Sequence, residues 1–365
     1  MKRLILYIIG VAFLSACSTT KHLPEGEILY TGQKPMIVEN RSTTPVGETA
    51  MEEIEAALAT APNNSFFGSS TVRIPFPFGL WVYNGFVKYE KGIGRWIFNK
   101  FAAKPVLLSS VNPDIRQKAA SNLLRDYGYF NGTVSYQTFI DPKDSLKAKL
   151  QYTVDMRNPY VIDTVTYHGF SERTLRIMEA SRRRSLISPG EQFNVLDLDG
   201  ERTRISDLLR NVGCYYFRPD YLVYQADTTL VPGGHVAMRM VPVAGMSKQA
   251  ERPFYVGRKS FFLMGRQGEM PNDSVEYKGL KIYYHDKLKL RPNMVYRWTN
   301  YQGYRMKRQV QDSTGITRRR SFEGLYSAYR QSRVQSRLSN VGIFRYADIQ
   351  YVPRDTALVS DTLDV

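Results

Sequence analysis

The sequence is poor in the residues that catalytic and metal-binding sites use most. Its 365 residues include only four histidines and two cysteines. The histidines lie in separate segments, without the spacing of metal ligands: His22, His168, His235 and His285. No Gly-x-Ser-x-Gly, His-Glu-x-x-His or phosphate-binding glycine loop is present. We therefore expect no enzyme, no metal and no soluble cofactor.

The first residues have the organisation of an export signal. Two basic residues precede an apolar run, Leu4 to Leu14, that is too short to span a bilayer permanently. The run ends in Leu14-Ser15-Ala16-Cys17, which resembles a bacterial lipobox. We therefore predict a signal peptide over residues 1–16 and a covalent lipid, such as palmitate, on Cys17. The alternative is a plain signal peptide followed by a chance cysteine. Ser18 stands where an aspartate would resemble an inner-membrane retention signal, so the outer membrane is favoured over the inner.

Positive charge is in excess along the chain. Lysine and arginine number 50 against 34 acidic residues, for a formal net charge of +16. Such a charge favours lipid headgroups, acidic proteins or nucleic acid. The runs Arg182–Arg184 and Arg318–Arg320 are compatible with nucleic-acid binding, but an exported lipoprotein rarely meets nucleic acid. We predict no nucleic-acid partner and expect solvated faces or contacts with outer-membrane lipid.

A helix-ending motif occurs three times. Each copy centres on a glycine, with apolar residues one, four and eight positions before it and a strand-like segment after it. The three glycines are Gly128, Gly213 and Gly342. This spacing puts the apolar residues on one face of a helix, and the glycine falls where a helix end favours a left-handed residue. One such join is common, but three with matching positions indicate a repeated module.

The order of elements predicts an α+β fold. The second copy reads strand, helix, helix, strand, strand, which favours a small mixed sheet with helices on one face. We predict a tether over residues 17–34, followed by modules over residues 35–155, 156–245 and 246–365. The third module is predicted to be interrupted in its last strand.

Residues 62–105, within the first module, are unusually aromatic and basic. The candidate membrane contacts in this insertion are Trp81, Tyr83, Lys88, Arg95 and Trp96. Aromatic rings beside cations are typical of a membrane–water interface, and they also suit a surface that binds a partner protein. The alternative is an insertion that packs on its own module.

Several motifs together resemble a known family. The Pro-Gly-Glu-x-Phe-Asn stretch at residues 189–194 and the three glycine corners resemble POTRA domains. With the lipobox and Cys17-Ser-Thr-Thr-Lys-His-Leu-Pro24, the chain resembles TamL-type lipoproteins of the BamA/TamA superfamily. The resemblance implies a lipid-anchored arm of tandem POTRA domains that faces the periplasm at the outer membrane. It also implies nascent outer-membrane proteins as clients and a TamB-like, periplasm-spanning partner.

In POTRA-like domains the strand after the glycine corner tends to lie at the edge of the sheet. That implies candidate edges at residues 133–140, 221–226 and 346–352, where an extended client segment would add as a further strand. The candidate contact residues are Val134, Tyr136, Thr138, Tyr221, Val223, Tyr224, Ile349 and Tyr351. The alternative function is a barrel-less periplasmic scaffold or binding lipoprotein that contacts an anionic membrane or a partner protein.

Overall fold

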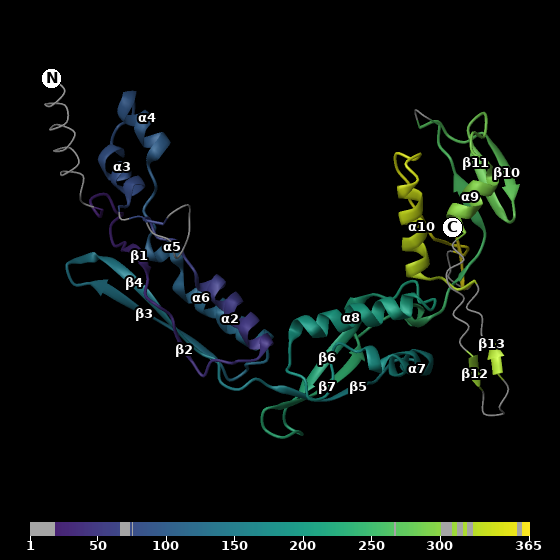
Figure 1. The fold of residues 1–365 in the computed structure, drawn as a ribbon, viewed down its shortest axis with the longest axis horizontal. Helices are drawn as coiled ribbons and strands as arrows, with labels where there is room; N and C mark the ends of the chain where they lie inside the picture. The colour runs from purple at the N-terminus through teal and green to yellow at the C-terminus, as the bar shows by residue number, and fades with distance from the viewer. Residues whose placement is uncertain are drawn as a thin grey trace. The chain divides into compact units, whose positions relative to one another are not determined.

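The computed structural model describes most of the chain after the predicted signal peptide. The described residues are 19–65, 74, 76–265, 268–300, 309–311, 317–319, 324–355 and 360–365, so Cys17 lies outside them. The chain divides into two compact units (Figure 1). Unit 1 comprises residues 1–163, 189–196 and 228–236, and unit 2 comprises residues 164–188, 197–227 and 237–365.

Unit 1 is built around a four-stranded mixed sheet. The central strand β4 (Asp144–Asp155) pairs antiparallel with β3 (Thr133–Asp141). On its other side β4 pairs parallel with β1 (Leu29–Gln33) and β2 (Ile37–Glu39). Alternate residues of β4 are buried, as expected of a strand with one face on a core: Ala148, Leu150, Tyr152 and Val154.

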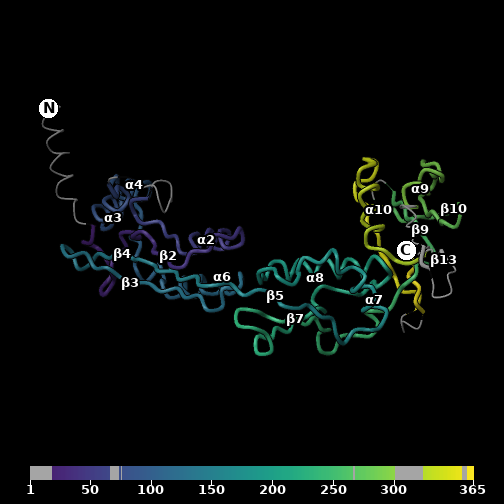
Figure 2. The backbone as a smooth tube through the Cα atoms, turned by 60° about the horizontal axis from the view of Figure 1, so that its bottom comes forward, coloured from purple at the N-terminus to yellow at the C-terminus, as the bar shows by residue number. Residues whose placement is uncertain are grey.

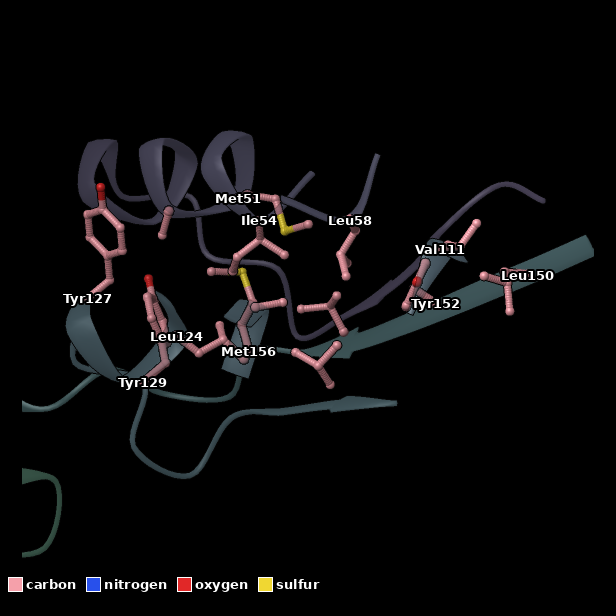
Figure 3. Packing of buried hydrophobic residues seen from close by; sticks show 14 of the residues in the cluster. Met51, Ile54, Leu58, Val111, Leu124, Tyr127, Tyr129, Leu150, Tyr152 and Met156 are labelled. Carbon is pink, nitrogen blue, oxygen red and sulfur yellow. The ribbon is translucent and has the colours of Figure 1, made fainter. Parts of the chain in front are cut away.

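Helices α2 (Pro45–Leu58) and α6 (Pro113–Asp126) supply the rest of this core (Figure 3). Thr44 caps α2, its Oγ1 accepting from the Gly47 N–H over 3.0 Å, and Pro45 takes the first helical position. Both are favourable helix starts. Met51, Ile54 and Leu58 then face Leu124 of α6. In sequence, α2 and α6 are separated by α3 (Phe78–Phe86), α4 (Gly92–Phe101) and the short α5 (Leu108–Val111).

Unit 2 contains most of the second sheet, whose strand order is β5 (Val161–Tyr167), β7 (His235–Pro242), β6 (Leu222–Asp227). Helices α7 (Glu172–Ala180) and α8 (Val195–Arg210) follow β5 in sequence. The fully buried Glu201 carboxylate is bound by Arg204, Ser185 and the Leu186 N–H. These partners make burial of the charge possible. Short 3-10 helices span Arg182–Arg184, Pro219–Tyr221 and Lys248–Glu251.

The C-terminal part of unit 2 holds further small sheets. One has the order β14 (Val352–Pro353), β15 (Thr362–Asp364), β8 (Tyr255–Val256). Another has the order β10 (Asp273–Tyr277), β11 (Leu280–Tyr284), β9 (Lys259–Phe262), next to α9 (Pro292–Thr299). The pair β12 (Gln309–Gln311) and β13 (Thr317–Arg319) precedes α10 (Ala328–Asn340).

Three sheets share one topology, with the last strand in the middle. The last strand of each sheet pairs on one side with the first strand of that sheet and on the other with the strand just before it in sequence. Thus β4 lies between β1 and β3, β7 between β5 and β6, and β15 between β8 and β14. The predicted α+β class with small mixed sheets is thus confirmed. The third sheet differs from prediction, because Thr362–Asp364 fills its central position and pairs on both sides. The module boundaries at residues 155 and 245 remain predictions.

Candidate functional site

The three glycine corners adopt the backbone conformation that the repeat predicts. Gly128, Gly213 and Gly342 have φ angles of 85°, 109° and 71°. At the first corner the Tyr129 N–H donates to the Leu124 carbonyl over 2.8 Å, and the Gly128 N–H donates to Arg125 over 3.0 Å. These two bonds close a helix through a left-handed glycine. The stripe residues Leu124 and Leu209 are fully buried, so the corners fix where each following strand begins.

Each of the first two corners also holds the start of the next module. The Gly128 carbonyl accepts from the Tyr160 N–H over 2.8 Å, and the Gly213 carbonyl accepts from the Phe254 N–H over 2.9 Å. Both donors directly follow a proline. The carbonyls of Tyr160 and Phe254 accept in turn from a residue that directly precedes a helix cap. The Phe193 N–H donates to the Tyr160 carbonyl and the Tyr326 N–H donates to the Phe254 carbonyl, each over 2.9 Å.

Aromatic rings fill both joints. Phe130, two residues after its glycine, lies 5.0 Å from the rings of Tyr160 and Phe193. At the second joint Tyr215, in the equivalent position, lies 4.8 Å from Tyr326. Sequence reasoning missed this joint in the third module, which has no Pro-Gly-Glu stretch. The available signal was the pair Phe193-Asn194 and Tyr326-Ser327, an aromatic residue followed by a capping residue.

Strand β3 is one edge of the first sheet, opposite β1 and β2, and among the described residues it pairs only with β4. Lys34 donates to the Leu150 carbonyl and Thr31 donates to the Ala148 carbonyl, so these β4 groups point away from β3. Their β3 partners are Thr138 and Ile140. In an antiparallel pair, the N–H and C=O groups of two opposed residues point either toward each other or both away from each other. The backbone groups of Thr138 and Ile140 therefore point away from β4, and so do those of the other even-numbered residues of β3, Val134 and Tyr136.

The predicted contact residues of β3 therefore have outward-facing backbone groups, with one position already occupied. The Gln117 side chain of α6 donates to the Val134 carbonyl over 2.8 Å, which covers the start of the edge. The Tyr136 hydroxyl donates to Asp114 of α6 over 2.8 Å, and this bond raises the pKa of the phenol. The open stretch is thus the backbone of Tyr136, Thr138 and Ile140, of which Ile140 was not predicted.

Strand β6 is one of the two edges of the second sheet, opposite β5, and within the described residues it pairs only with β7. The Met240 carbonyl accepts from His168, beyond β5, so Met240 and its β6 partner Tyr224 face away from each other. The outward series is therefore Leu222, Tyr224 and Ala226. Val223 was predicted to be available, but in this register its groups face β7. Tyr221 was predicted to lie in the strand, but it ends the 3-10 helix that begins at Pro219.

The side chain of Tyr224 does not extend from the edge toward a client. Its hydroxyl donates to the Leu198 carbonyl of α8 over 3.3 Å, and the Arg202 guanidinium lies over its ring. Burial, with the nearby Glu201 carboxylate second, raises the pKa of Tyr224 well above its ordinary value. Only the backbone of Tyr224 is thus open at this edge, while the ring fastens α8 to the sheet.

The third predicted edge, residues 346–352, was wrong over most of its length. Only Val352 lies in a strand, β14, and Ile349 and Tyr351 lie outside the strands. Asp348 accepts from the Ile349 N–H over 2.9 Å, a local bond that competes with a strand ladder. Tyr351 packs against Tyr215 and Tyr326. Burial raises the pKa of Tyr351 to about 12, as expected of a core ring.

The predicted membrane contacts all lie on the α3–α4 hairpin. The two helices pack through Tyr83 and Phe98, whose ring centroids are 5.7 Å apart. Trp81 is half-buried beside Phe76, whereas Trp96, Lys88 and Arg95 are exposed. Across the part of the chain that the structure describes, no group of histidine, cysteine, aspartate or glutamate residues is arranged to hold a metal. No described helix is long and apolar enough to cross a membrane.

Comparison with known proteins finds similar solved structures at low identity. No protein-family model and no curated protein match the chain. It is similar to POTRA domains 3–5 of BamA from Haemophilus influenzae, with 11% identity, a TM-score of 0.37 and coverage of 94% of this chain and 96% of that one. POTRA domains 1–3 of Omp85 from Anabaena give 12% identity, a TM-score of 0.28 and coverage of 93% and 94%. The N-terminal domain of Omp85 from Thermosynechococcus elongatus gives 14% identity, a TM-score of 0.26 and coverage of 93% of this chain and 96% of that one.

Proposed function

We propose that this chain is a periplasmic arm for outer-membrane biogenesis that binds extended segments of client proteins by strand addition. The observation that carries the proposal is the pair of open edges on β3 and β6. Natural sheets guard free edges with lysine, proline or inward-pointing charge. Strands β3 and β6 contain no lysine, no arginine and no proline, and their only charged residues are the ones that end them, Asp141 and Asp227.

Main-chain pairing at such an edge tolerates many client sequences, because it uses backbone groups that every residue carries. This suits a factor that handles many barrel precursors. The resemblance to TamL-type lipoproteins supports the outer membrane as the setting, a lipid on Cys17 as the anchor and a TamB-like protein as a partner. Acylation is tested by metabolic labelling with a fatty acid, which should label the wild-type chain and leave Cys17→Ala unlabelled.

The test of strand addition is a proline at an outward-facing position. In Thr138→Pro the lost N–H faces away from β4, so the ladder within the sheet is kept. We expect this variant to fold and to lose binding of a labelled, extended peptide with alternating apolar residues, measured by fluorescence anisotropy. Ala226→Pro tests the β6 edge in the same way.

The matched control is Gln137→Pro, whose N–H faces β4. It should lower the unfolding midpoint, because it removes a ladder bond. Unchanged peptide affinity in a combined Thr138→Pro and Ala226→Pro variant that is still folded would contradict strand addition at these edges.

A further inference from the structure

Helix α4 carries an apolar stripe that the described structure leaves uncovered. None of its ten residues is buried. Ile93 is 79% exposed, Trp96 58% and Phe101 50%. Ile93 and Trp96 are three positions apart, so they share a face of the helix. Apolar side chains grouped on one exposed face mark a site of contact with a membrane or another protein.

The stripe continues onto α3. The ring of Phe101 lies 6.2 Å from Trp96 and 6.3 Å from Phe78, edge to face in both cases. Phe78 is itself exposed. We call Phe78, Ile93, Trp96 and Phe101 the aromatic face. Its two helices are held close at Gly79, whose carbonyl accepts from the Ala103 N–H over 2.9 Å and where an added Cβ would lie 2.7 Å from the Ala103 side chain.

Charge around the aromatic face is almost entirely positive. Between residues 76 and 105 the only acid is Glu90, against five basic residues: Lys88, Lys91, Arg95, Lys100 and Lys104. Protein interfaces are depleted in lysine, so a protein partner fits this composition poorly. Helices that lie in the headgroup region of a bilayer combine lysine and arginine with tryptophan and phenylalanine, as this hairpin does.

The hairpin is fastened to the described N-terminal segment. Asn84 of α3, which is buried, donates to the Thr19 carbonyl over 3.1 Å and accepts from the His22 N–H over 3.2 Å. The segment runs beside α3 in both backbone views (Figure 1, Figure 2). Thr19 is two residues after Cys17, and two residues span at most about 7 Å. A lipid on Cys17 would therefore reach the bilayer close to the hairpin.

We propose that the aromatic face of the α3–α4 hairpin binds the surface of an anionic lipid bilayer and lies in its headgroup region. With a lipid on Cys17 this makes a two-point attachment, in which the hairpin would hold the first module against the bilayer. The two-point attachment rests on the proposed lipidation. Binding by the hairpin does not depend on it.

The test uses the chain from residue 17 onward with Cys17→Ala, so that neither the predicted signal peptide nor an acyl group contributes. The chain has three tryptophans, Trp81, Trp96 and Trp298. Trp81→Phe and Trp298→Phe leave Trp96 as the only tryptophan. Its fluorescence is excited selectively, and the vesicles carry bromine on their acyl chains as a quencher. We expect vesicles of phosphatidylcholine and phosphatidylglycerol to quench Trp96, and vesicles of phosphatidylcholine alone to quench it much less. A chain that retains only Trp298 should not be quenched.

Two variants assign the binding to the hairpin. Ile93→Asp should weaken binding by roughly ten-fold or more, as expected for losing burial of an isoleucine side chain. Lys91→Gln with Lys100→Gln should weaken it by more than about ten-fold at low salt, since each cation near an anionic surface contributes about five-fold. The control is Ile115→Ser, at an exposed position on α6, which should bind like the parent chain.

Absence of Trp96 quenching would overturn the proposal, and so would equal quenching by neutral vesicles. Self-association that Ile93→Asp removes, without binding to vesicles, would show that a second copy covers the face instead. Failure of acyl labelling at Cys17 with Trp96 quenching intact would remove only the second attachment point.

Discussion

The backbone N–H of Phe254 donates to the carbonyl of Gly213, and the N–H of Tyr160 makes the same bond to Gly128. Each bond joins the glycine that ends one module to the residue after the proline that opens the next. The joint therefore depends on a glycine for two reasons. The positive φ of the glycine ends the helix, and its missing side chain leaves room for the segment that packs against it.

Substitution of the first corner glycine should reveal both effects. A Cβ on Gly128 would lie 2.6 Å from the Phe193 carbonyl oxygen, whereas one on Gly342 meets nothing within 4 Å. Gly342→Ala should cost about 1–2 kcal/mol of unfolding free energy, from left-handed strain alone. Gly128→Ala should cost more, because the clash adds to the strain. Equal costs in chemical denaturation would mean that Gly128 does not crowd the joint.

The repeated leucines should behave as core residues. Leu124→Ala and Leu209→Ala should each lower the free energy of unfolding by about 2–5 kcal/mol, the usual cost of truncating a buried leucine. Leu230→Ala, at a side chain that is 84% exposed, is the control and should have little effect. Unchanged unfolding midpoints in the first two variants would show that the repeat does not mark the core.

The third sheet should weaken in acid. Arg354 donates to the Asp364 carboxylate over 2.7 Å, and this hydrogen bond is the main reason that the pKa of Asp364 lies below its ordinary 3.8. A lowered folded-state pKa stabilises the fold above the ordinary pKa, and the effect is lost as pH falls through the folded value. The protection factors of the amides in β8 and β15, which correct for the intrinsic exchange rate, should therefore fall as pH drops below about 4.

Asp364→Asn should remove most of this pH dependence, while Asp220→Asn, at an exposed carboxylate, should keep it. If the acid response is the same in Asp364→Asn as in the parent chain, another group is responsible.

Gln117 should limit access to the β3 edge. Its amide occupies the Val134 carbonyl, so Gln117→Ala should free one backbone acceptor and tighten binding of an extended peptide by up to about 1 kcal/mol, the net value of one hydrogen bond. Gln151→Ala is the matched control, because that amide donates to Pro35 instead. Weaker binding in Gln117→Ala would indicate that the glutamine contacts the client.

Local rules predicted the elements that repeat in sequence. The stripe ending at Leu124 and the positive φ of Gly128 and Gly213 follow from helical spacing and helix termination, which act within one turn. The sequence could not predict which alternate residues of β3 and β6 turn their backbone groups outward. That choice depends on the register with β4 and β7, and on which groups of β4 and β7 bond to the strands on their other side. Residues 346–351 were mistaken for a strand because Ile349 and Tyr351 alternate as strand residues do. The Tyr351 ring instead packs against the distant rings of Tyr215 and Tyr326.

The most direct test of strand addition is residue-resolved hydrogen exchange by NMR, with and without the extended peptide. In the free chain the register predicts slow exchange at residues 135, 137 and 139, which face β4, and fast exchange at residues 136, 138 and 140. The account predicts that peptide binding slows the second set and leaves the first unchanged, with the same pattern at residues 224 and 226 of β6. Peptide binding that leaves exchange at both edges unchanged would contradict it.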